Sequence, residues 1–149
     1  MKRKKGNKKV RNATTKVYKG IKFRSKLELF TYIKLEEAGI KALYEKKKFT
    51  LMEGFYFDAI SIEPSTRAET RGQFLENEYK VRDITYTPDF VDPNGKWIIE
   101  VKGYANDTFP MKWKMFKNHL QNSEEDIPIL YLPKNQGHVL KVIDMIKAL

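Results

Sequence analysis

The chain has 149 residues, enough for one domain with a substantial core, and its 29 Lys and Arg against 19 Asp and Glu give a net charge of +10. It has no cysteine, which excludes disulfides, zinc–thiolate sites and cysteine nucleophiles, and its two histidines leave little for a histidine metal site. No apolar run approaches the length of a membrane span and no signal-peptide core is present, so we expect a cytoplasmic protein with no membrane partner.

The positive charge is concentrated at the N-terminus. Twelve of the 29 Lys and Arg precede Glu28, the first acidic residue, and the rest of the chain carries a net charge of −2. Residues 1–16 show no apolar periodicity, and we expect a disordered basic arm that binds DNA, although a solubility tail or a localisation signal is the alternative. The candidate DNA-binding residues of this basic N-terminal segment are Lys2, Arg3, Lys4, Lys5, Lys8, Lys9, Arg11 and Lys16.

Residues 17–149 are expected to form one domain. Ser25 and Glu28 have the spacing of a capping box and Gly39 is a plausible stop, so the sequence predicts a helix from Ser25 to Gly39. Residues 42–51 have some strand character, and 55–62 are rich in aromatic and β-branched residues, which predicts a strand. Residues 63–78 are polar and charged and are expected to be a loop, so that 55–78 as a whole is interpreted as an insertion.

The second half of the chain predicts a hairpin from residues 79–91 and 96–102, a helix over 108–120, a strand over 127–132 and a closing helix. Val139, Val142, Ile143 and Ile146 supply the helical spacing of that last element. Pro88 cannot donate to a strand ladder and therefore marks an edge, a bulge or a break. This order of elements predicts an α/β domain with a mixed central β-sheet flanked by helices.

The hairpin brings two acidic residues together. Asn94-Gly95 is a strong signal for a two-residue turn, and counting outward from it places Asp89 directly opposite Glu100. A four-residue loop would make the contact diagonal, and a three-residue loop would separate the acids. Glu100 and Lys102 share a strand face because side chains alternate. Like charges directly opposed are destabilising, so such a pair needs a cation between its members.

This grouping suits phosphodiester hydrolysis. Mg²⁺ prefers oxygen ligands, and Asp89, Glu100 and the backbone carbonyl of Val101 would supply them. Lys102 would orient the attacking water or stabilise the pentacoordinate phosphate. The alternatives are structural: Glu100 and Lys102 could be a solvent-facing pair, Asp89 a turn residue, and Glu28 only the capping glutamate of its helix.

Two blocks of the sequence resemble the PD-(D/E)xK nuclease superfamily and, within it, the phage endonuclease I type of Holliday junction resolvase. The resemblance implies a restriction-endonuclease-like core, a Mg²⁺ or Mn²⁺ cofactor, and a homodimer that nicks two opposed strands of branched DNA. It also implies that Glu28 joins Asp89, Glu100 and Lys102 in the active site and is a further candidate metal ligand. The blocks are Phe23-Arg24-Ser25-x-Leu27-Glu28 with Leu35-Glu36, Gly39-Ile40-Lys41 and Tyr44-Glu45, and Tyr86-Thr87-Pro88-Asp89-Phe90 with Pro93-Asn94-Gly95 and Glu100-x-Lys102-Gly103.

The sequence therefore predicts a metal-dependent DNA endonuclease, a phage Holliday junction resolvase acting in the cytoplasm of a bacterial host. Lys114 and Lys117, on the predicted helix 108–120, are additional candidates for DNA contact. Residues 55–78 and the chain after Gly103 have no counterpart in the resemblance. The alternatives are a restriction-like or general structure-specific nuclease, and a DNA-binding protein without catalytic activity.

Overall fold

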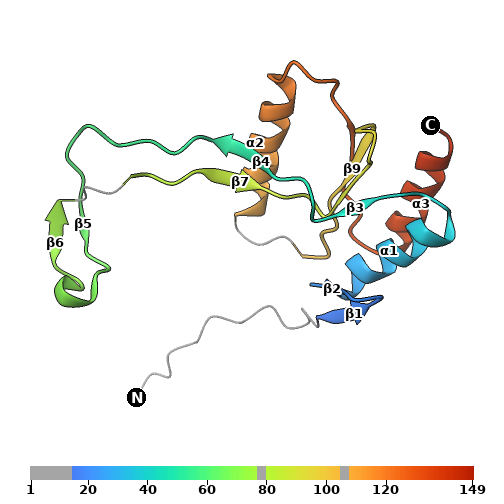
Figure 1. Cartoon of the computed structure of the whole chain (residues 1–149), viewed down its shortest axis with the longest axis horizontal. Helices are drawn as coiled ribbons and strands as arrows, with labels where there is room; N and C mark the ends of the chain where they lie inside the picture. The colour runs from blue at the N-terminus through green and yellow to red at the C-terminus, as the bar shows by residue number, and fades with distance from the viewer. Residues whose placement is uncertain (1–14, 77–79, 105–107) are drawn as a thin grey trace.

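The computed structural model describes residues 15–76, 80–104 and 108–149, which form a mixed α/β fold (Figure 1). In chain order the elements are β1 (Lys16–Tyr18), β2 (Ile21–Phe23), α1 (Lys26–Glu37), β3 (Leu43–Tyr44), β4 (Phe49–Met52), β5 (Ile62–Pro64), a 3₁₀ helix η1 (Ala68–Thr70), β6 (Phe74–Glu76), β7 (Ile84–Tyr86), β8 (Phe90–Val91), β9 (Trp97–Ile99), α2 (Phe109–Gln121), β10 (Ile129–Tyr131) and α3 (Gln136–Lys147).

The central sheet has four strands in the order β10-β9-β8-β3. β9 pairs in parallel with β10, while β8 is antiparallel to both β9 and β3, so the sheet is mixed as the sequence predicts. Parallel strands need a crossover connection, and α2 supplies it between β9 and β10. β4 and β7 form a separate antiparallel pair.

Two hydrophobic cores lie on the two faces of the central sheet. One contains Trp97, Ile99 and side chains of α1 and α3, and the other contains Ile98 and side chains of α2. Successive residues of β9 therefore enter opposite cores, as strand alternation requires. All three residues of β9 are buried, so this strand is the partition between the cores.

The three predicted α-helices are confirmed. In α1 the Ser25 hydroxyl accepts a hydrogen bond from the Glu28 N–H at 3.1 Å, and Gly39 follows the helix with φ of 69°. In α3 the Asn135 side chain accepts from the His138 N–H at 2.9 Å. Local signals at both ends of a helix therefore define α1 before any tertiary contact is considered.

The N-terminal β-hairpin is an element that the sequence did not predict. Lys16 pairs with Phe23, and Lys19 and Gly20 both have positive φ in the turn that joins β1 to β2. Phe23 is fully buried in the core with α1 and α3. The basic segment expected to span 1–16 therefore overlaps an ordered strand at Lys16; its other candidate residues lie outside the described part of the chain.

The predicted strand over 55–62 is wrong. Only Phe55 makes a bridge, to Val81, and β5 begins at Ile62 and pairs with β6 inside the segment expected to be a loop. Aromatic and β-branched residues favour strands when they can pack against a half-buried surface, and here their side chains are exposed. Residues 53–76 and 80–83 instead run out from the β4–β7 pair to a β5–β6 hairpin far from the domain body (Figure 1), and we name these described residues the β-arm.

Candidate active site

The β8–β9 hairpin sets the register of the two predicted acids. Phe90 lies opposite Ile99, and the Asp92 N–H donates to the Trp97 carbonyl at 3.0 Å. The next pair outward in this register is Asp89 and Glu100, as predicted. The turn differs in detail, because the Gly95 N–H bonds the Asp92 carbonyl at 2.9 Å and four residues, 93–96, separate the bonded positions. The expectation that a four-residue loop would make the acid contact diagonal is wrong, because these four residues are centred on Asn94-Gly95 and the directly opposed register is kept.

Asp89 and Glu100 are both buried, with exposed fractions of 8% and 3%. Asp89 Oδ2 accepts the Val101 N–H at 2.7 Å across the hairpin. Glu100 Oε2 accepts the Tyr86 hydroxyl at 2.6 Å, and Glu100 Oε1 accepts Lys102 Nζ at 2.9 Å. The burial of Glu100 argues against a solvent-facing pair of Glu100 with Lys102. The burial of Asp89 argues against a simple turn aspartate.

Lys102 completes this group from the same strand face as Glu100. Its Nζ also lies 4.7 Å from the centroid of the Phe109 ring, at the start of α2. A cation over an aromatic face is attracted by the ring quadrupole. Glu100 and Phe109 together therefore orient the amine, which keeps partial solvent exposure.

Glu28 has an observed structural role. Its Oε1 accepts the Ser25 hydroxyl at 2.7 Å, and its Oε2 accepts the Arg24 N–H at 3.1 Å and the Tyr44 hydroxyl at 2.7 Å. With the Ser25 contact to the Glu28 N–H, this is the reciprocal arrangement of a capping box. The carboxylate is nevertheless buried on the side of α1 that faces the sheet, where it also acts electrostatically on Asp89.

The acids form one electrostatic group. Burial raises the pKa of Asp89 well above its ordinary value, and the negative charges of Glu100 and Glu28 raise that pKa further. The Val101 N–H and Lys102 act in the opposite direction. Glu100 and Glu28 therefore both act on Asp89 as negative charges, and a cation bound beside Asp89 would relieve that repulsion.

The oxygen donors at this position fit a hard divalent cation. Within the described residues there is no group of three or more His, Asp or Glu side chains arranged to hold a metal ion. A metal here would therefore be held by the carboxylates of Asp89 and Glu100, the Val101 carbonyl and water. Mg²⁺ is commonly bound in this way, by one or two carboxylates with several waters retained.

Two tyrosines of the site have roles that the sequence did not reveal. Tyr86, the last residue of β7, donates to Glu100, and Tyr44, the last residue of β3, donates to Glu28. Burial raises the pKa of each phenol, and the neighbouring glutamate raises it further, so both are neutral donors. Each stands within the sequence blocks quoted above, but nothing in local spacing shows which carboxylate a tyrosine meets across the fold.

Three of the candidate DNA-binding residues fall within the described part of the chain. Lys114 and Lys117 are exposed on α2, with Lys117 Nζ 5.6 Å from the centroid of the Trp113 ring, and Lys16 is exposed on β1. Lys2, Arg3, Lys4, Lys5, Lys8, Lys9 and Arg11 fall outside the described residues.

Comparisons with known proteins place the chain in a family without assigning an activity. The family model described as "Protein of unknown function (DUF1064)" matches residues 4–132, a range that includes all four predicted catalytic residues. No curated protein and no solved structure matches the chain. In the described part of the chain no helix has the length and apolar character to cross a membrane.

Proposed function

The chain belongs to the DUF1064 family, and we propose that it is a metal-dependent DNA endonuclease of the PD-(D/E)xK type. The observation that carries the proposal is the buried, opposed pair of Asp89 and Glu100 with Lys102 beside it. Two buried acids in register are costly without a cation. Their position on a hairpin, followed by a lysine on the same face, is the pattern that the resemblance implies.

In this proposal Asp89 and Glu100 share one task and Lys102 has another. Asp89 and Glu100 would hold Mg²⁺ or Mn²⁺ together with the Val101 carbonyl, and Tyr86 fixes one oxygen of Glu100. When bound, the metal neutralises charge on the phosphate and lowers the pKa of an attacking water. Lys102 places its ammonium group where it orients that water or stabilises the pentacoordinate phosphate.

Glu28 is assigned to the same active site as a further metal-facing acid. Support comes from its burial and its electrostatic effect on Asp89. Its capping bonds do not exclude this role, because a carboxylate has about four lone-pair sites. Glu28 would then serve both as the capping residue of α1 and as a residue of the active site. This double role would link the start of α1 to the β8–β9 hairpin.

We propose branched DNA as the substrate and a homodimer as the working form, in phage replication or recombination within a bacterial host. Resolution of a four-way junction needs two symmetric cuts, and a two-fold dimer supplies two equivalent sites. The basic N-terminal segment and the exposed lysines of α2 suit contact with phosphates over reading of base edges. A restriction-like or structure-specific nuclease, or a non-catalytic DNA-binding protein, are the competing functions.

Cleavage of a four-way junction beside a linear duplex of the same sequence tests these possibilities. We expect cleavage only with Mg²⁺ or Mn²⁺, none in EDTA, and preference for the junction. Equal cleavage of both substrates would remove the resolvase but leave the nuclease. Binding of both without cleavage under any metal condition would leave only the DNA-binding protein.

A further inference from the structure

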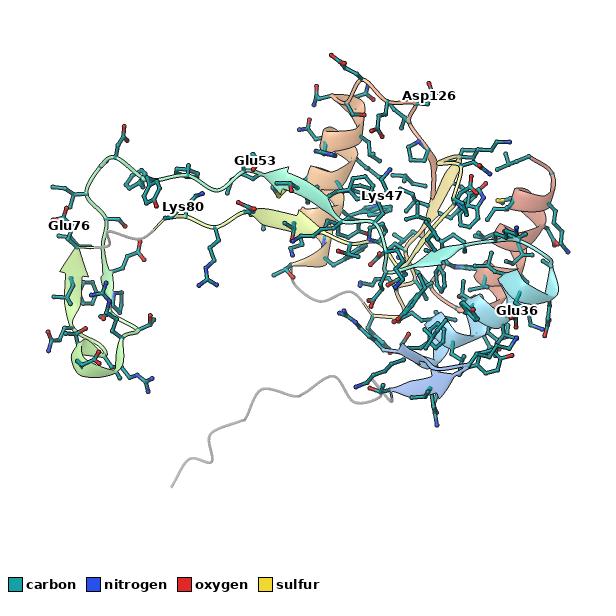
Figure 2. All side chains as sticks on the ribbon, viewed as in Figure 1. Glu36, Lys47, Glu53, Glu76, Lys80 and Asp126 are labelled. Carbon is teal, nitrogen blue, oxygen red and sulfur yellow. The ribbon has the colours of Figure 1, made fainter. Side chains whose placement is uncertain are left out.

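The β-arm exposes an unusual amount of apolar surface. No described residue between positions 53 and 83 is buried. Figure 2 shows this segment, with Glu53, Lys80 and Glu76 labelled along it, extending away from the packed body. Tyr56, Ile60 and Phe74 are 73%, 71% and 71% exposed. The exposed large apolar side chains of the β-arm are Phe55, Tyr56, Phe57, Ile60, Ile62, Phe74, Leu75 and Val81.

The β-arm is held in shape by main-chain pairing without a core of its own. Phe55 and Val81 exchange both backbone hydrogen bonds, at 3.0 and 2.7 Å, and the Gly54 N–H donates to Asp83 Oδ1 at 2.7 Å. A two-stranded hairpin alone is marginally stable in water. Large contiguous apolar surfaces on a protein usually mark an interaction site. We therefore expect the exposed apolar side chains of the β-arm to be buried against a binding partner.

The charge of the β-arm indicates what covers it. Residues 53–83 contain seven acidic and four basic residues, a net charge of −3. The rest of the chain carries +13, of which residues 1–14 carry +7 and the body, residues 15–52 and 84–149, carries +6. A net negative, apolar ribbon is repelled by DNA phosphates. The strongly basic remainder of this same chain is complementary to it.

We infer that the β-arm is a self-association surface that docks onto the body of a second copy of the chain. Exchange of the two arms about a two-fold axis makes each copy both donor and acceptor, which closes the assembly at a dimer. A stable interface uses about 20–30 residues on each side, and the 28 described residues of the β-arm supply that many. This inference rests on the homodimer of the proposed function and identifies the β-arm as the surface that forms it. It does not depend on nuclease activity.

The test replaces exposed apolar side chains of the β-arm in the full chain. The triple variant Tyr56→Ser, Ile60→Ser, Phe74→Ser alters residues that contribute nothing to the cores, so circular dichroism and thermal unfolding of its monomer should show an intact fold. The matched control is Val17→Ser, which removes an equally exposed side chain, at 71%, from β1 on the body. Sedimentation velocity at micromolar to tens of micromolar protein measures the assembly.

We expect a dimer for the wild-type protein and the control, and a monomer for the triple variant. The charge-reversed variant Asp58→Lys, Glu69→Lys, Glu76→Lys should also dissociate more readily than the wild type at low salt. A wild-type monomer throughout the concentration range, or a triple variant that stays dimeric, overturns the inference.

Cleavage assays on the same proteins separate this inference from the proposed function. If the wild type dimerises through the β-arm but cleaves no DNA under any metal condition, the nuclease fails and the docking surface stands. If the monomeric triple variant still nicks single strands but no longer makes paired cuts, both stand. Unchanged paired cutting by a triple variant that remains dimeric removes the docking surface alone.

Discussion

Tyr86 donates its hydroxyl proton to Glu100 Oε2 at 2.6 Å in the buried part of the candidate site, while Lys102 occupies the other carboxylate oxygen at 2.9 Å. The two partners come from different places, the end of β7 and the strand of Glu100 itself. A carboxylate held at both oxygens cannot rotate freely, so its orientation is set before any substrate arrives. This is the kind of preorganisation on which electrostatic catalysis depends.

Tyr86→Phe should therefore weaken activity without dismantling the core. The change removes the hydroxyl and keeps the ring, which packs at 4.6 Å from the Phe116 ring centroid. Loss of a hydrogen bond to a charged acceptor should lower the free energy of unfolding by about 1.5–3 kcal/mol. We expect a lower cleavage rate and a higher Mg²⁺ requirement, measured by metal titration of the initial rate. An unaltered metal requirement would show that Lys102 alone orients Glu100.

Asp89→Asn, Glu100→Gln and Lys102→Ala should each reduce Mg²⁺-dependent cleavage by at least about 10²-fold, because each removes a charged side chain from the candidate active site. Far-UV circular dichroism and DNA binding should be retained. Asp92→Asn is the matched control: Asp92 is another buried acid of this hairpin, and its Oδ2 accepts the Lys96 N–H at 2.9 Å in the turn. It should cost stability but not activity. Near-normal cleavage by purified Asp89→Asn or Glu100→Gln protein contradicts the assignment.

Glu28→Gln distinguishes the cap from the active site. The amide keeps an oxygen acceptor for the Ser25 hydroxyl or the Arg24 N–H but removes the charge that acts on Asp89. We expect cleavage to be lost while the free energy of unfolding changes by less than about 1 kcal/mol, the usual scale of a lost cap. The opposite result, lower stability with normal specific activity, would leave Glu28 as a capping residue only.

The raised pKa of Asp89 makes the metal-free protein sensitive to pH. The folded state holds this proton to higher pH than the unfolded state does, so ionisation of Asp89 costs stability as pH rises from about 4 through the raised pKa. In EDTA, the wild type should lose stability relative to Asp89→Asn over that interval, measured by chemical denaturation. If Mg²⁺ binds Asp89 as proposed, it requires the ionised carboxylate, so its stabilising effect should grow with pH in the wild type and be absent in the variant.

Removal of the basic N-terminal segment should weaken DNA binding without affecting the metal site. Because Lys16 pairs with Phe23 in β1, the deletion should stop before it and cover residues 2–14, which removes seven basic side chains. Each phosphate contact contributes about −0.9 to the slope of log affinity against log salt on duplex DNA. A shallower slope by fluorescence anisotropy is expected, and an identical slope would show that the segment does not contact DNA.

The elements that could be predicted from sequence are those with local signals. Ser25, Glu28 and Gly39 delimit α1, and the turn around Asn94 determines the register that opposes Asp89 to Glu100. Pro88, which lacks an N–H, falls in the break between β7 and β8, as predicted. Each of these features depends on residues close in the chain.

The elements that failed depend on contacts between distant segments. The aromatic residues after Gly54 have strand propensity, but whether they enter a sheet depends on a surface to pack against, and no described residue of the β-arm is buried. The tyrosine contacts to Glu28 and Glu100 join residues 16 and 14 positions apart through the tertiary fold. No local pattern specifies such pairs, which is why the carboxylates could be proposed from sequence and their donors could not.

The placement of β9 between two cores also determines how long the site lasts once formed. The Glu100 and Lys102 amides bond the Tyr131 and Pro133 carbonyls, each at 3.0 Å, and the strand before them is buried on both faces. We therefore expect these bonds to open less often than the exposed pairing of Phe55 with Val81. On that expectation the β-arm opens and re-forms repeatedly while Asp89, Glu100 and Lys102 keep their positions.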